Sequence, residues 1–194
     1  RFAPIRQQTS KTQGVMSELS AIRMLADYNQ WMNGRLYEAT ATLPEAVRRE
    51  DRGAFFGSIE STLNHLLVAD TLWLKRFAVH PACIDSLAPI TLLPTPPALD
   101  APVRETFAEL HLHRLWLDQQ IVDWCGDLRD ADLDYVLSYR NSKGVAARRR
   151  FGSLLTHFFN HQTHHRGQVT TLLSQAGVDV GVTDLLVRIA DEMQ

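Results

Sequence analysis

Residues 151–177 constrain the fold of this chain most strongly, because apolar side chains recur through them at helical spacing. The apolar positions are Leu154, Leu155, Phe158, Val169, Leu172, Leu173 and Ala176. Gly177 follows the last of them, and glycine suits the left-handed conformation that commonly ends a helix. The pattern predicts one long helix that buries a single face against the rest of the chain.

Half of the eight histidines of the chain lie in this segment, at His157, His161, His164 and His165. On a helical wheel, His165 falls within the apolar arc and His161 at its edge, whereas the other two fall outside it. We therefore expect His161 and His165 to point inward, and the other two toward solvent or a partner. Two inward imidazoles one turn apart favour a divalent metal such as zinc, nickel or iron. The alternative is a pair of core histidines held by hydrogen bonds.

Three earlier helices are expected, over residues 17–42, 58–79 and 103–124. In the first, Asn29 and Asn33 have two interpretations, since asparagine is a poor helix former. They are either exposed, or turned inward to hydrogen-bond a buried polar site.

Histidines also occur in the other two expected helices. His65 lies at the edge of the apolar face of the second helix. A single histidine there is more often a core residue than a ligand, unless another helix brings further imidazoles to the same level. His111 and His113, in the third helix, are two residues apart and cannot share a face. We expect both of them at the surface.

The connections are informative as well. Residues 81–102 contain six prolines and cannot form one helix, because an internal proline removes a backbone donor and clashes with the preceding turn. So long a crossover allows the next helix to run parallel to the last. Between residues 132 and 150 the apolar period changes to two, around a turn at 141–144, which predicts a short β-hairpin.

Composition excludes several classes of partner. The chain has 194 residues, 45% of them hydrophobic, which fits a single folded domain over residues 17–194 behind a loose tail over residues 1–16. A net charge of -2 gives no field that favours nucleic acid or an anionic membrane. No apolar run approaches the roughly 20 residues that span a bilayer. Cys83 and Cys125 are far apart, which favours reduced thiols and a cytoplasmic location.

Together these elements predict an all-α protein: a four-helix bundle with a long proline-rich crossover between its second and third helices, and a short β-hairpin before its fourth. Ligands from different helices converge in the interior of a bundle. His65, His161 and His165 would then form a three-histidine site with open positions, which is typical of catalytic rather than structural metals.

The chain resembles the DinB family, also called DinB/YfiT-like, over nearly its whole length. The resemblance is carried by L-A-D-Y-N-Q-W-M-N, L-N-H-L-L-V-A-D-T-L-W-L, F-N-H-Q-T-H-H-R-G-Q and the closing G-V-D-V-G-V-T-D-L. It implies a four-helix bundle, usually a homodimer, that binds a divalent metal through three histidines. The matching positions here are His65, His161 and His165. Other recurring positions of the family match residues that would support the ligands or line the pocket, namely Asn33, Arg166 and Gln168.

The resemblance also suggests a function, since relatives include metal-dependent transferases and isomerases that use low-molecular-weight thiols. The first hypothesis is therefore a metal-dependent enzyme, such as a transferase that acts on the sulfur of such a thiol. The alternatives are a non-catalytic, stress-related metal-binding protein and a metal-dependent hydrolase. A basic or aromatic pocket wall near the metal would favour an enzyme, and a fourth protein ligand would favour a binding protein.

Overall fold

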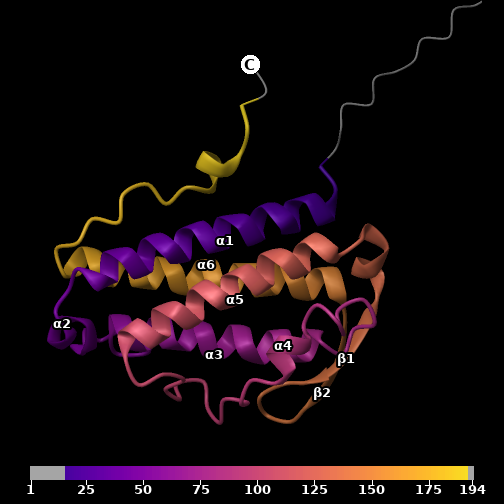
Figure 1. Ribbon diagram of the computed structural model, residues 1–194, viewed down its shortest axis with the longest axis horizontal. Helices are drawn as coiled ribbons and strands as arrows, with labels where there is room; N and C mark the ends of the chain where they lie inside the picture. Colours follow the sequence, from indigo (N-terminus) through magenta and orange to yellow (C-terminus); the bar gives the residue numbers. More distant parts are fainter. Residues whose placement is uncertain (1–15, 192–194) are drawn as a thin grey trace, which may run out of the picture.

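The computed structural model describes residues 16–191, which are mostly helical and carry one two-stranded antiparallel sheet. The long helices run side by side, with the sheet at one end (Figure 1). The long helices are α1 (Glu18–Ala41), α3 (Ile59–Phe77), α5 (Phe107–Asp127) and α6 (Phe151–Gln175). Helix α1 packs on α5 and α6, and α3 packs on α6, so α1 and α3 occupy opposite sides.

Side-chain caps define where three of the long helices begin. Ser17 accepts a hydrogen bond from the backbone of Ser20 at the start of α1, and Ser58 accepts one from Ser61 at the start of α3. Both starts agree with the sequence pattern. Helix α5 begins later than expected, because Thr106 and Glu109 form a reciprocal capping box there.

The hairpin and the end of α6 follow the sequence closely. Strand β1 (Val136–Arg140) pairs with β2 (Ala146–Arg150) in antiparallel register, with Val136 opposite Arg150 and Arg140 opposite Ala146. Gly177, just after α6, has a φ of 79°, the left-handed conformation expected of it.

The described chain ends with a 3-10 turn at Leu185–Arg188. Three other short helical segments were not expected from the pattern: α2 (Glu45–Arg49), α4 (Ala88–Thr91) and the 3-10 turn Asp130–Asp134. Helix α4 interrupts the proline-rich connection between α3 and α5, with a proline in its first turn. These segments are too short for apolar periodicity to reveal them.

The predicted tail over residues 1–16 lies, except for Met16, outside the described residues. No helix in the described part of the chain is long and apolar enough to cross a bilayer.

The apolar core is shared by all four long helices and includes an aromatic cluster. Phe77 of α3 stacks on Trp124 of α5 and meets the edges of Phe151 and Phe158 of α6. The Trp124 indole nitrogen donates a hydrogen bond to the Cys83 sulfur at 3.1 Å. Cys83 and Cys125 are both free, as the sequence predicted, and both are buried.

A buried polar network crosses this core. The Arg114 guanidinium forms ion pairs of 2.6 Å with both Asp70 of α3 and Asp118 of α5. All three side chains are at most 2% exposed. Burial alone would lower the pKa of Arg114, but the carboxylates of Asp118 and Asp70 outweigh burial and raise it. Arg114 therefore stays charged and compensates the two acids.

The asparagines of α1 and a second arginine complete the network. Asn29 and Asn33 both donate hydrogen bonds to Asp118, at 3.1 and 2.9 Å. Arg166 of α6 donates to the side-chain oxygen of Asn29. Two arginines and two aspartates are thus buried together, with no net charge. Of the two interpretations of the asparagines, the inward one is correct.

His113 is buried, so its predicted surface position is wrong. Its ring is 8% exposed, and neither ring nitrogen has a hydrogen-bond partner in the structure. Burial, with the nearby charges of Arg104 and Arg114, lowers the pKa of His113 to about 4. The imidazole is therefore neutral in the folded protein at pH 7.

Replacing Arg114 tests how much the buried ion pairs contribute to the stability of the fold. Arg114→Met leaves two carboxylates buried without their cation, and we expect the free energy of unfolding to fall by about 3–5 kcal/mol in urea titrations. The matched control is Arg129→Met, which breaks a 3.5 Å pair with Asp132 in which the arginine side chain is 79% exposed. That variant should be nearly as stable as the parent. Equal losses in both variants would contradict the role assigned to the network.

His113 should also contribute to acid sensitivity. Between pH 6.5 and 4, the unfolded chain binds a proton at this histidine and the folded chain does not, so stability falls as the pH is lowered through this range. In metal-free protein, the parent should lose on the order of 2 kcal/mol more than His113→Gln between pH 7 and pH 5. Urea titrations at the two pH values measure the difference, and identical losses would refute it.

Candidate metal centre

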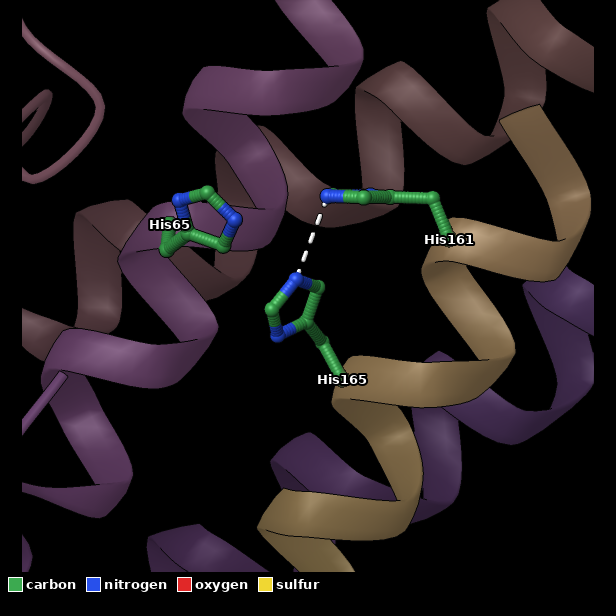
Figure 2. Close-up of side chains that lie close together, drawn as sticks. All are labelled: His65, His161 and His165. Atoms are coloured by element: carbon green, nitrogen blue, oxygen red, sulfur yellow. Dashed lines mark hydrogen bonds between the residues drawn. The ribbon is translucent and has the colours of Figure 1, made fainter. Parts of the chain in front are cut away.

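Three histidines from two helices meet inside the molecule. His65 comes from α3, and His161 and His165 come from α6 (Figure 2). Each histidine offers one ring nitrogen as a ligand atom, and these three nitrogens all lie within 4.8 Å of one another. The Nε2 atoms of His161 and His165 are 3.1 Å apart. The structure thus brings together the three histidines that the wheel and the family resemblance selected.

The positions of these side chains follow from the packing of α3 on α6. His65 and His165 are buried, at 4% and 8% exposure, and His161 is partly buried. His157 and His164 are exposed, as the apolar arc of α6 predicted. The pair on α6 is one turn apart, so both rings reach the same side of the helix.

Hydrogen bonds fix two of the three rings. Nδ1 of His65 lies 2.8 Å from the carbonyl oxygen of Leu99, and Nδ1 of His165 lies 2.8 Å from Oε1 of Gln168. Each oxygen is an acceptor, so each Nδ1 carries the proton and each Nε2 presents a lone pair. Outward hydrogen bonds of this kind orient the imidazoles that bind metals in proteins.

The cluster is held in its neutral form. Burial lowers the pKa of His65 and of His165, against the opposing effects of their hydrogen bonds to Leu99 and Gln168. Burial, followed by the proximity of His165 and His65, lowers the pKa of His161 to about 3. All three imidazoles are therefore unprotonated at pH 7, the state in which they bind a cation.

The residues that surround the cluster were only partly foreseen. Of the three supporting candidates, Gln168 bonds a histidine of the cluster directly. Asn33 and Arg166 instead belong to the buried network around Asp118 and Asn29. No hydrogen bond joins either of them to the three histidines. A match to recurring positions could not distinguish these two environments.

Phe56 and the Leu99 carbonyl are contacts that sequence reasoning missed. The Phe56 ring stacks on His65 with centroids 3.8 Å apart, and its edge approaches His165. Both groups come from irregular segments, where no periodicity indicates which way a residue faces. The adjacent aromatic pair Phe55–Phe56 was visible in the sequence, but nothing in its pattern tied it to a histidine.

A cavity of about 220 Å³ opens beside the cluster. Its lining includes His65 and His161 of the cluster, together with Trp73, Arg76 and His157. The wall near the cluster is therefore both aromatic and basic.

The donor set fits a divalent metal. Two nitrogens bound to one tetrahedral zinc lie about 3.3 Å apart for Zn–N bonds of about 2.0–2.1 Å. The observed separation of 3.1 Å between the two Nε2 atoms of α6 is close to this. Within residues 16–191, no fourth histidine, cysteine or carboxylate joins the group. Three imidazoles without a fourth protein ligand are typical of catalytic metal sites.

Comparison with known proteins agrees with the geometry. The model of the DinB family matches residues 11–193. The chain is similar to Protein DinB of Bacillus subtilis (strain 168), with 27% identity over 165 residues that cover 82% of this chain and 88% of the relative. No solved structure shows significant similarity to this chain. The family match spans nearly the whole sequence, and the chain therefore belongs to the DinB family.

Proposed function

We propose that this protein is a divalent-metal-dependent enzyme that transfers a group to or from the sulfur of a low-molecular-weight thiol. His65, His161 and His165 would hold the metal. The observation that carries the proposal is the meeting of three neutral imidazoles beside a cavity, without a fourth protein ligand among the described residues. The metal is zinc, nickel or iron, all of which accept imidazole ligands.

The residues of the chain have distinct parts in this proposal. His65 and His165 are held through Nδ1 by Leu99 and Gln168, which leaves their Nε2 lone pairs available to a metal. Phe56 covers His65 and limits the access of water from its side. A metal bound there favours the thiolate form of a thiol and so raises its nucleophilicity at neutral pH. The cavity wall then orients the second reactant.

The cavity wall favours an enzyme over a non-catalytic, stress-related binding protein. A storage or structural site has no need of a cavity at the metal and is usually closed by four ligands. Here Trp73 and Arg76 face a space that reaches the histidines. A metal-dependent hydrolase is the second candidate, since the same open site can acidify a water molecule.

The finer features of the resemblance are part of this proposal. We propose that the four long helices form the family's four-helix bundle, with residues 81–102 as its crossover. We also propose that the protein is a cytoplasmic homodimer without a nucleic-acid or membrane partner.

Metal content tests the site directly. Protein expressed without an affinity tag should contain about one divalent ion per chain, and His161→Ala should lose most of it, since a three-ligand site has no spare donor. The control is His164→Ala, which removes an exposed histidine three residues along the same helix. Elemental analysis of the three proteins measures the difference. Equal metal content in the parent and in His161→Ala would contradict the proposed metal site.

Turnover is tested with thiols and a simple electrophile. Metal-loaded protein, mixed with cysteine, glutathione or coenzyme A and 1-chloro-2,4-dinitrobenzene, should form the thioether faster than the uncatalysed reaction. A carbon–sulfur bond forms, a carbon–chlorine bond breaks, and chloride and a proton are released. The acceleration should disappear in His161→Ala and persist in His164→Ala. Thiol-independent hydrolysis of 4-nitrophenyl acetate, without thioether formation, would favour the hydrolase instead.

A further inference from the structure

A second, larger hollow adjoins the cavity beside the histidines. It has a volume of about 720 Å³, and its lining residues come from α3, the connection before α5 and the hairpin. The two spaces share five lining residues: Leu72, Arg76, Leu99, Asn141 and Ser142. The two spaces therefore adjoin one another, and together, as the groove, they extend from His65 and His161 to the hairpin.

The walls of this groove carry positive charge only. Arg76 lines both spaces, and Lys75 and Arg140 line the outer one. Neither lining includes an aspartate or a glutamate, although the chain as a whole has 22 acidic residues and a net charge of -2. Lys75 and Arg140 are each engaged with a backbone carbonyl oxygen, that of Thr91 and that of Gly144.

Arg76, unlike these two cations, is held by aromatic rings and not by a hydrogen-bond acceptor among the described residues. Its guanidinium lies over the Trp73 ring at 4.6 Å and near the Tyr139 ring at 5.9 Å. Among the described residues, no ion pair and no hydrogen bond engages it. Burial lowers the pKa of Arg76, and only Tyr139 opposes this shift. The positive charge is therefore partly desolvated, and no carboxylate within residues 16–191 stabilises it. Both buried arginines of the described chain, by contrast, have polar partners: Arg114 pairs with two aspartates, and Arg166 donates a hydrogen bond to Asn29.

We propose that Arg76 binds the carboxylate of a small organic ligand in this groove. A guanidinium presents a planar fork that matches a carboxylate with two parallel hydrogen bonds. Of the three cations, only Arg76 also lines the inner space, so one negative charge is balanced beside the histidines, which favours a carboxylate over a phosphate dianion. The aromatic and aliphatic walls formed by Trp73, Tyr139 and Leu72 suit the apolar part of the same molecule.

The inference deepens the proposed function and rests on it in one respect: the bound molecule is a substrate of the metal site. His161 lines the inner space together with Arg76, so a ligand anchored at the guanidinium extends toward the three histidines. Arg76 is then a residue that determines specificity and orients the ligand. The carboxylate belongs either to the thiol or to its reaction partner.

Calorimetric titration of the metal-free protein tests the anion site by itself. The probes are benzoate, its neutral analogue benzamide, and inorganic phosphate. Benzoate should bind more tightly than benzamide, and phosphate should not compete with it at equal concentration. Arg76→Met should weaken benzoate binding at least tenfold and leave benzamide binding unchanged, whereas Arg76→Lys should restore part of the loss. The control is Arg149→Met, which removes an equal charge from an exposed position outside both linings.

Several results would overturn the inference. They are undetectable binding of benzoate, equal affinity for benzoate and benzamide, effective competition by phosphate, or equal losses in Arg76→Met and Arg149→Met. Because no metal is present, none of these results depends on the proposed enzymatic function.

A second experiment, in metal-loaded protein, distinguishes the two sources of the carboxylate. Two thiols are compared, 3-mercaptopropionate with the acid and 2-mercaptoethanol without it. Two electrophiles are compared in the same way, 4-chloro-3,5-dinitrobenzoate and 1-chloro-2,4-dinitrobenzene. Arg76→Met should reduce the preference for whichever reactant carries the acid.

Discussion

The buried ion pairs of Arg114 with Asp70 and Asp118 hold the helices in their mutual positions. A charged group inside a protein is tolerated only when its partners are in place, so the network permits one relative placement of the helices that supply it. Asp70 lies on α3, five residues after His65. Arg166 lies on α6 directly after His165 and bonds Asn29 of α1. The same contacts that satisfy the buried charges therefore set the level at which the histidines of α3 and α6 meet.

Electrostatics divides the interior beside these helices into three regions. Around Arg114 the charges are compensated within the protein. At the three histidines the side chains are held neutral, with lone pairs free to bind a cation. Along the groove at Arg76 a positive charge has no compensating group among the described residues. A cation and an anion are thus favoured at neighbouring places, which is the arrangement a site needs to hold a metal beside a carboxylate ligand.

Much of this could be predicted from the sequence, because the decisive signals are periodic or local. The long helices, the hairpin and the inward direction of His161 and His165 follow from apolar spacing, and Gly177 ends α6 as expected. Periodicity could not reveal the depth of a side chain or its distant partner. His113 was therefore misplaced at the surface, and Asn33 and Arg166 were grouped with the histidines although they bond elsewhere. The contribution of Leu99 was invisible, because a backbone oxygen leaves no trace in the residue type.

The connection between α3 and α5 has two separate parts: its backbone orients His65, and its residues line the outer hollow. The ring of His65 needs an oxygen at position 99 but no particular side chain there, since the acceptor is the carbonyl group. Thr95, Pro96 and Ala98 line the outer hollow and make no hydrogen bond to the three histidines. A descendant of this sequence can therefore exchange these residues and take a different molecule, provided that the length of the segment, and with it the carbonyl, is preserved. Selectivity and metal affinity can in this way diverge independently within a single loop.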